Sequence, residues 1–192
     1  MNGGYYPAWG KRLLDLTLAS AALLVLAPLL LLVALAIWLE DRGPVLFRQQ
    51  RSGRNGQPFT LLKFRSMPVG SANLPSHEAA RLGVTRVGAL IRRTNIDELP
   101  QLLNIVAGDM SLVGPRPALP SQTELLALRR ENGSIACRPG LTGQAQINSY
   151  DGMPVTHKAE QDGEYARHVN FPHDCAIILR TFRYLARRPP VY

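Results

Sequence analysis

The longest apolar stretch of the chain lies close to its N-terminus. From Leu16 to Leu39 the sequence runs for 24 residues without a charged side chain, and most of them are Leu, Ala or Val. As a helix this stretch is about 36 Å long, enough to cross the apolar core of a bilayer, which is roughly 30 Å thick. Length alone therefore predicts a single membrane-spanning helix.

Two features of this stretch favour a different arrangement. Pro28 lies in its middle, where a proline removes a backbone hydrogen bond and bends or breaks a helix. Basic residues flank the stretch on both sides, with Lys11 and Arg12 before it and Arg42 after it, whereas a spanning helix carries its basic flank on one side. We therefore expect residues 11–40 to form a re-entrant membrane helix that turns back at Pro28.

A cleaved signal peptide is a third interpretation, because Ala34-Leu35-Ala36 resembles a cleavage site. The apolar stretch is longer than the apolar region of a signal peptide, usually about 7–15 residues, and the candidate site lies inside it, before Ile37. The exported chain would also lack a disulfide framework, since its two cysteines are Cys137 and Cys175. We expect the helix to be retained.

Beyond residue 40 the chain is polar and rich in turns, and its apolar positions occur in short groups. Residues 45–47 and 59–64 are typical of two short strands, and the turn residues 52–56 between them predict a hairpin. The remaining pattern predicts an irregular connection at 71–76 and three helices. The first helix is capped by Thr85 and ends at Arg93, and the second runs from Asn95 to Ala107. The third runs from Ser121 to Gly133 and opens with a capping box.

The C-terminal segment has the pattern of an amphipathic helix. Its apolar face consists of Ile178, Phe182 and Leu185. Its basic face consists of Arg180, Arg183 and Arg187. Such a helix fits a membrane interface and, on pattern alone, equally fits the surface of a protein core; the apolar N-terminal stretch favours the membrane. Together these elements predict the α+β class, mostly α: a small membrane-associated domain with an N-terminal re-entrant hydrophobic helix, interfacial amphipathic helices and a short β-hairpin.

The charge balance indicates an anionic partner. The chain has 22 Lys and Arg against 14 Asp and Glu, a formal net charge of +8, and 19 of the basic residues are Arg, the side chain best shaped to bind phosphate through two parallel hydrogen bonds. Nucleic acid, phosphorylated ligands and acidic lipids all match such a charge. The sequence contains no Walker A loop, no Gly-x-Gly-x-x-Gly and no nucleic-acid motif, so we expect no nucleic-acid partner.

The densest cluster of polar residues contains two adjacent carboxylates, Asp97 and Glu98, at the predicted start of a helix. The helix dipole favours the ionised form there, and an ionised Asp is a competent nucleophile toward phosphorus. Acidic residues are also common in first helical turns for capping alone. Arg116 lies between two prolines and Arg138 beside a Pro-Gly turn, so both are presented rigidly, as suits a phosphate clamp.

Four motifs occur together along the chain, at residues 63–67, 97–102, 108–117 and 138–143. In this order and spacing the sequence resembles the bacterial sugar transferases, the monotopic phosphoglycosyl transferases that start membrane glycan assembly. The similarity runs from about Lys11 to Arg188. It implies one domain over residues 1–192, in which residues 11–40 re-enter the bacterial inner membrane and residues 41–192 form a catalytic part on the cytoplasmic face.

The resemblance also implies a two-step reaction on a UDP-sugar. Asp97 matches the nucleophile that attacks the sugar-bearing phosphate and releases UMP, after which a polyprenol phosphate such as undecaprenyl phosphate accepts the phosphosugar. Glu98 matches the neighbouring acid, which either assists proton removal or, with Asp97, holds Mg²⁺. The candidate phosphate-binding residues are Lys63, Arg65, Arg92, Arg116 and Arg138.

Some positions depart from the common family pattern. Ala27 stands where the best-described members have a Ser before the proline, Gln144 stands where many have Trp, and Ser149-Tyr150 replace a frequent Gly-Arg. The last two changes lie in a segment that shapes nucleotide or sugar contacts, so the resemblance does not identify the sugar. The exact polyprenol, the pathway and the formation of a homodimer also stay open.

A non-catalytic membrane adaptor that binds anionic lipids through its basic surface is the alternative function. It accounts for the charge and the apolar stretch but not for Asp97 and Glu98 beside the ordered arginine motifs. Loss of either carboxylate leaves an adaptor intact and abolishes the enzyme. Asp162 and Tyr165 match a familiar Asp-x-x-Tyr spacing, for which a structural role is an equal alternative.

Overall fold

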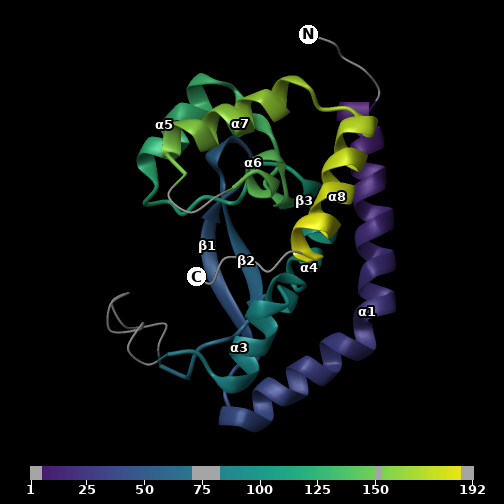
Figure 1. Ribbon diagram of the computed structural model, residues 1–192, viewed down its shortest axis with the longest axis vertical. Coiled ribbons are helices and arrows are strands. Elements are labelled where there is room, and N and C mark those ends of the chain that lie inside the picture. Colours follow the sequence, from purple (N-terminus) through teal and green to yellow (C-terminus); the bar gives the residue numbers. More distant parts are fainter. Residues whose placement is uncertain (1–5, 71–82, 150–152, 187–192) are drawn as a thin grey trace.

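The computed structural model describes residues 6–70, 83–149 and 153–186. Most of these residues are helical, and α1 runs along one side of the body that the other elements form (Figure 1). In chain order the elements are η1 (Tyr6–Gly10), α1 (Lys11–Asp41), β1 (Leu46–Ser52), η2 (Arg54–Gly56), β2 (Pro58–Phe64), α3 (Arg86–Arg93), η4 (Ile96–Glu98), α4 (Gln101–Ala107), β3 (Ser111–Val113), α5 (Thr123–Glu131), η5 (Ser134–Ala136), β4 (Gly140–Thr142), α6 (Gln144–Ile147), α7 (Val155–Arg167) and α8 (Phe171–Ala186).

The long helix α1 contains Pro28 and is visibly bent (Figure 1). Its first arm runs beside α8 and α4, and its second arm turns beneath α3. Proline bends a helix because it donates no hydrogen bond and its ring clashes with the carbonyl group four residues earlier. The bend lets the two arms pack on separate apolar clusters, one containing Ala19 and the other containing Val33 and Ile37.

Most of α1 exposes apolar side chains. Within the described ranges it is the one helix long and apolar enough to cross a membrane by length and composition, and only 6% of its most apolar stretch is buried. This low burial distinguishes α1 from the core helix of a water-soluble domain. Leu24, Val25 and Leu31 are 70–79% exposed, and an apolar surface of this extent requires an apolar covering.

Both ends of α1 are bonded to the same body of the protein. Near its start, Arg12 donates from both terminal nitrogens to the last carbonyl oxygens of α4, at 2.6 and 2.9 Å. Near its end, Glu40 accepts from the backbone N–H of Arg86 at 2.7 Å, and Asp41 forms a two-pronged ion pair with Arg65. These contacts hold both ends of α1 against one body of the protein.

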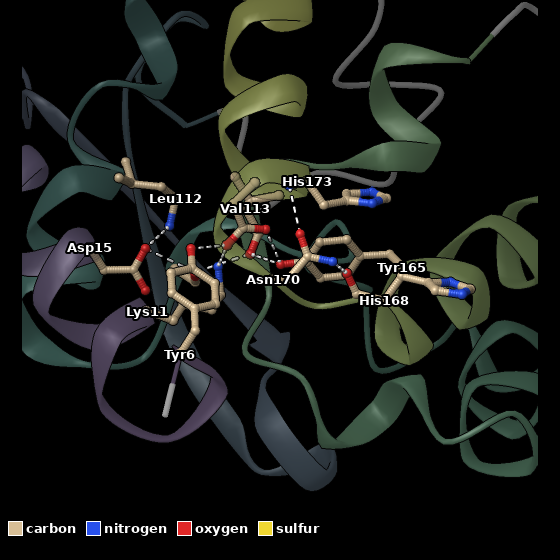
Figure 2. A network of polar contacts seen from close by, with 11 residues as sticks. Tyr6, Lys11, Asp15, Leu112, Val113, Tyr165, His168, Asn170 and His173 are labelled. Carbon is tan, nitrogen blue, oxygen red and sulfur yellow. Dashed lines mark hydrogen bonds and ion pairs between the residues drawn. The ribbon is translucent and has the colours of Figure 1, made fainter. Parts of the chain in front are cut away.

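A buried polar network joins α1 to α7, α8 and β3 (Figure 2). At its centre is Asp174 of α8, which is 1% exposed. This carboxylate accepts hydrogen bonds from Tyr6 Oη at 2.6 Å, Lys11 Nζ at 2.7 Å and Tyr165 Oη at 2.9 Å. Beside it, Asp15 of α1 accepts from a backbone N–H of β3 at 2.9 Å. The donors compensate the cost of burying two carboxylates, so the network fixes the start of α1 against the body.

The residues of the Asp-x-x-Tyr spacing both have structural contacts. Asp162 of α7 accepts from Nε and Nη2 of Arg129 of α5, at 2.9 and 2.7 Å, and both side chains are buried. Tyr165 belongs to the Asp174 network. Arg129 also donates to the carbonyl oxygen of Arg116 at 3.0 Å, so this pair of helices supports the loop that carries Arg116.

The expected hairpin is confirmed, although it is longer than expected. β1 and β2 pair antiparallel from Leu46 opposite Phe64 to Ser52 opposite Pro58. The additional strand residues of β1 are polar, so they had no apolar pattern to mark them. A second pair, β3 with β4, is parallel and was not expected. It brings the loops that follow the two strands together.

The helix expected from Asn95 to Ala107 is wrong in its extent. Asn95 adopts a left-handed conformation, with φ of 54°, and Pro100 lies at the N-terminal boundary of α4. The chain therefore forms the 3-10 turn η4 and, after Pro100, the short helix α4. By contrast, the helix capped by Thr85 is confirmed, since the Thr85 hydroxyl accepts from Gly88 N at 2.9 Å.

The capping box expected at Ser121 is also wrong. Helix α5 begins at Thr123 with Gln122 as its N-terminal boundary, and it ends at Glu131, before Gly133. The side chain of Gln122 instead accepts from the backbone N–H of Leu119 at 2.9 Å, which holds the preceding turn. The irregular connection expected at 71–76 lies outside the described residues.

Helix α8 has two apolar faces rather than one. Ile177, 2% exposed, packs on the core with Tyr165. On the side predicted from the sequence, Phe182 and Leu185 are 66% and 43% exposed. The helix thus covers the protein core with one face and leaves a second apolar face uncovered, as an interfacial helix requires. Arg187 lies beyond the described residues.

Candidate active site

A cleft of about 1810 Å³ opens between the hairpin, η4 and the loop after β3, and it extends to α1 and α8. Part of its lining is basic and includes Arg48, Arg51, Lys63, Arg92, Arg93 and Arg116. Another part is apolar and includes Leu18, Ala22 and Leu26 of α1 and Ile178, Phe182 and Leu185 of α8. A cleft with both kinds of lining suits a ligand that carries a phosphate group and an apolar chain.

The adjacent carboxylates lie in this cleft, on the 3-10 turn η4. The left-handed Asn95 before the turn and Pro100 after it separate η4 from α3 and α4, and both Asp97 and Glu98 line the cleft. The two carboxylates therefore have different surroundings although they are neighbours in sequence.

Glu98 is held between two cations. Its Oε1 accepts from Lys63 Nζ at 2.6 Å and from Arg116 Nη2 at 3.0 Å. Burial acts to raise the pKa of Glu98, but the charges of Arg116 and Lys63 outweigh it and lower the pKa to about 2. Glu98 is therefore ionised at neutral pH, and it fixes the positions of both cations.

Asp97 has no comparable ion pair. No side chain in the described parts of the chain bonds to its carboxylate. Burial and the negative charge of Glu98 raise its pKa, and Lys63 and Arg92 oppose this shift only in part. A carboxylate that is desolvated and unpaired is more basic and more nucleophilic than one held in an ion pair.

The two carboxylates should therefore affect stability in opposite directions. We expect Asp97→Asn to raise the melting temperature at pH 7.5, because it removes a desolvated charge; the gain should disappear as the pH falls toward the ordinary Asp value of about 3.9. Glu98→Gln should lower the free energy of unfolding at pH 7.5 by about 2 kcal/mol, after allowance for the half-exposed Arg116. That loss should fade as the pH falls from about 4.3 toward 2.

Thermal unfolding of both variants and the parent protein in one detergent, at several pH values, measures these effects. Asp109→Asn is the matched control, because Asp109 is a carboxylate outside the cleft lining. A lower melting temperature for Asp97→Asn at pH 7.5 contradicts the raised pKa of Asp97.

Four of the five candidate phosphate-binding residues line the cleft: Lys63, Arg65, Arg92 and Arg116. Lys63 and Arg116 are bonded to Glu98, and the other two are also bonded to the protein. Arg92 donates to Ser66 Oγ at 2.7 Å, which fixes its guanidinium, and Arg65 is largely occupied by Asp41 at the end of α1. Arg65 thus ties the long helix to the cleft wall.

The structure does not bring Arg138 to the cleft. Its Nε donates to the carbonyl oxygen of Gly108 at 2.9 Å, beside the C-terminal end of α4, and it is not among the residues that line the cleft. The rigid Pro-Gly turn after Arg138 serves the β3–β4 pairing instead. Gly140 approaches the backbone so closely that a Cβ atom on it would lie 2.1 Å from Gly114 N.

Sequence reasoning did not select three cations that line the cleft, Arg48, Arg51 and Arg93, and Arg51 has the most contacts with the site. Arg51 of β1 lines the cleft and bonds to Gln49 Oε1 and to the carbonyl oxygen of Pro117 at 3.1 Å. Burial and the positive charge of Arg116 lower the pKa of Arg51. Only the β1–β2 pairing brings Arg51 into the site, and the sole signal in the sequence was its place in a polar, alternating strand.

The site offers Mg²⁺ few protein ligands. The described residues contain no group of three or more His, Cys, Asp or Glu side chains that could surround a metal ion. Mg²⁺ is, however, commonly bound by one or two carboxylates together with water and substrate phosphates. The unpaired carboxylate of Asp97 and the neighbouring Glu98 fit this second kind of site.

The sequence matches a known family over most of its length. The family described as "Bacterial sugar transferase" matches residues 6–188. Over 89% of its length the chain is 43% identical to the UDP-glucose:undecaprenyl-phosphate glucose-1-phosphate transferase of Caulobacter vibrioides, of which the match covers 67%. Over 90% of its length it is 45% identical to the undecaprenyl-phosphate glucose phosphotransferase of Komagataeibacter xylinus, of which the match covers 35%.

A third relative has a similar length. The exopolysaccharide production protein PSS of Rhizobium leguminosarum bv. phaseoli is 39% identical, and the match covers 88% of each chain. The chain therefore spans about two thirds of the Caulobacter relative, about one third of the Komagataeibacter relative and most of the Rhizobium relative. From the match over residues 6–188 and these identities, the chain belongs to the bacterial sugar transferase family, a family of transferase enzymes.

Proposed function

We propose that this protein transfers a phosphosugar from a UDP-sugar to a polyprenol phosphate, with UMP as the second product. One observation carries the proposal: Asp97, half-buried and without an ion pair in the described parts of the chain, lies among cations in a cleft whose lining continues onto apolar residues of α1 and α8. The printed names of the relatives, which act with UDP-glucose or on undecaprenyl phosphate, support the same pair of substrates. The first membrane step of polysaccharide assembly requires this reaction.

In the first step, a carboxylate oxygen of Asp97 attacks the phosphorus atom that bears the sugar. An Asp97–phosphorus bond forms, the bond from this phosphorus to the bridging oxygen breaks, and UMP leaves with that oxygen. The raised pKa of Asp97 supports the step, because a more basic carboxylate is a better nucleophile in its ionised form.

In the second step, a phosphate oxygen of the polyprenol phosphate attacks the same phosphorus atom. The new bond gives polyprenol diphosphate sugar, and the Asp97 carboxylate is released unchanged. The apolar lining from Leu18, Leu26 and Phe182 suits the polyprenol chain, which then holds its phosphate at the basic wall. The acceptor need not leave the bilayer.

The cations stabilise the charge that moves between the phosphates. Lys63 and Arg116 are fixed by Glu98, and Arg92 is fixed by Ser66, so three positive charges are in place before the substrate arrives. Phosphoryl transfer depends mainly on such positioning and charge neutralisation. Mg²⁺, held by Asp97 or Glu98 and the substrate diphosphate, would neutralise further charge on the leaving UMP.

The proposed location is the cytoplasmic face of the bacterial inner membrane. α1 enters the bilayer and returns at Pro28, and the uncovered apolar face of α8 lies in the interface. The bonds at both ends of α1 and the exposure of its middle support this placement. The cytoplasmic face is where UDP-sugars are available.

The experiment that tests the proposal is intact-mass spectrometry of the detergent-solubilised protein with Mg²⁺ and a panel of UDP-sugars, without lipid. We expect the mass to increase by one phosphosugar, with equimolar UMP, for the correct donor. UMP release only after polyprenol phosphate is added would contradict a stable covalent intermediate and favour direct transfer. No UMP under either condition, from folded protein and every donor, would favour the adaptor function.

A further inference from the structure

Two arginines bind the C-terminal end of α4 and a third lies near them, outside the catalytic cleft. Arg12 of α1 donates to the carbonyl oxygens of Ile105 and Val106, and Arg138 donates to that of Gly108 at 2.9 Å. The open side of Gly108 faces Arg12, whose Nη2 lies 3.4 Å from the position that a Cβ atom would take. These two guanidinium groups therefore meet at Gly108.

The third member of this arginine cluster comes from the tip of the hairpin. Arg54 donates from Nε to the carbonyl oxygen of Ala136 at 3.0 Å, two residues before Arg138. Burial is the largest cause that lowers the pKa of Arg138, and the nearby positive charges of Arg54 and Arg12 lower it further. Three segments far apart in the sequence thus place like charges together, although like charges repel one another.

No carboxylate in the described ranges is bonded to the cluster. None of the three arginines forms an ion pair with an acidic residue in the described ranges. The nearby Asp15 is buried and accepts from Ser111 Oγ and the backbone of β3, and the carboxylate of Asp109 accepts from Asn104 at 3.3 Å. The charge of Asp15 offsets part of the positive charge at Arg138, and the three guanidinium groups together leave the cluster positively charged.

Capping of α4 does not account for the whole cluster. The carbonyl groups at the end of a helix carry only about half an elementary negative charge in total, against three full positive charges. Arg54 and Arg138 each use only Nε for a carbonyl oxygen, and their terminal nitrogens make no bond within the described part of the chain. Guanidinium groups that are fixed at Nε and open at both terminal nitrogens suit bidentate binding of phosphate.

Exposed apolar side chains border the cluster. Trp9 and Leu13, on either side of Arg12 in the sequence, are 80% and 65% exposed. On α4, Leu103 and Val106 are 46% and 36% exposed, and the carbonyl oxygen of Val106 is one of the two that Arg12 binds. A ligand at this place meets both a concentrated positive charge and apolar surface, as the headgroup region of a membrane lipid does.

We propose that Arg12, Arg54 and Arg138 form a binding site for the phosphate headgroup of an anionic membrane lipid, separate from the site of sugar transfer. None of the three lines the catalytic cleft. The bound lipid fixes the hairpin tip and the start of α1 to the bilayer surface together. The proposal does not depend on the transferase reaction and holds equally for a protein without it.

The two tryptophans of the chain provide the test, because Trp9 lies beside the cluster and Trp38 near the other end of α1. Trp38→Phe leaves Trp9 as the single reporter, and Trp9→Phe leaves Trp38. Each protein is placed in two kinds of nanodisc that contain the anionic lipid phosphatidylglycerol and the neutral lipid phosphatidylcholine at equal mole fraction. In one kind the phosphatidylglycerol carries brominated chains, and in the other the phosphatidylcholine does. We expect brominated phosphatidylglycerol to quench Trp9 more strongly than brominated phosphatidylcholine does, and to quench Trp38 without this preference.

Removing charge from the cluster should remove the preference. The single variant Arg54→Gln and the double variant Arg54→Gln with Arg138→Gln should bind phosphatidylglycerol more weakly. The apparent affinity, measured by quenching of Trp9, should fall about fivefold for each charge removed. Arg54→Lys should retain most of it. Arg167→Gln, on an exposed position at the end of α7, is the matched loss of charge and should change nothing.

Three results would overturn the proposal. One is equal quenching of Trp9 by the two brominated lipids, and another is an unchanged preference in the double variant. The third is displacement of the preference by millimolar inorganic phosphate at constant ionic strength, which would assign the cluster to a soluble anion. The melting temperature of each variant confirms that the protein is folded.

Discussion

Replacing Asp97 with asparagine should lower the rate of UMP release, with both substrates and Mg²⁺ present, by about 10⁴-fold or more. An amide nitrogen or oxygen is a poor nucleophile toward phosphorus, and no other side chain of the described site has the same position and a free carboxylate. The variant should bind the UDP-sugar with nearly unchanged affinity, since Lys63, Arg92 and Arg116 stay in place. Steady-state UMP release and equilibrium binding of the donor measure the two effects separately.

The neighbouring variants make this prediction specific. Asp97→Ala should be as inactive as Asp97→Asn, which excludes conversion of the new asparagine back to aspartate. Glu98→Gln should lose less activity, because it loosens Lys63 and Arg116 without removing the nucleophile. Asp109→Asn is the control outside the cleft. More than a tenth of the parent rate in Asp97→Asn would show that Asp97 is not the nucleophile.

The second large effect concerns the side of the membrane on which the two ends of α1 lie. In a background with Cys137 and Cys175 replaced by serine, we expect a cysteine at position 9 and one at position 50 to react from the same side. Trp9 and Gln50 are both exposed and lie before and after α1. Contacts at both ends of the helix hold it to one body, so under the proposed re-entrant arrangement the two positions face the same compartment.

Labelling with a membrane-impermeant maleimide measures this arrangement as an all-or-none result. Both cysteines should be protected in intact spheroplasts and should react in inside-out vesicles. Reaction of Trp9→Cys in spheroplasts together with protection of Gln50→Cys would establish a spanning helix and contradict the re-entrant one. Denatured samples show that each cysteine is reactive.

Local patterns along the chain predicted the elements that carry a strong local signal. The apolar run predicted α1, its proline predicted the bend, and Thr85 predicted the start of α3. The parallel pair of β3 and β4 was not predictable, because each strand has three residues and its partner lies far along the chain. Three residues are too few to show a period, and close backbone contact at Gly114 and Gly140 holds the pair instead.

The candidate site was predicted in part, for similar reasons. The resemblance to the family predicted that Lys63, Arg92 and Arg116 bind phosphate, and all three line the cleft. The difference between Asp97 and Glu98 could not be predicted, since it depends on the 3-10 turn that Pro100 imposes and on which carboxylate the cations reach. Arg138 carried the same local signal as Arg116, a guanidinium beside a stiff turn, yet tertiary packing directs it to α4.

The contact between Lys11 and Asp174 has a consequence for the order in which the protein is built. The two residues are separated by 163 positions, so during translation the first turn of α1 emerges long before the carboxylate that neutralises it. Under the proposed re-entrant arrangement, α1 partitions into the lipid while Lys11 is still unpaired and hydrated. Docking of α8 onto that first turn is then a late event, and it completes an anchor that the bilayer has already positioned.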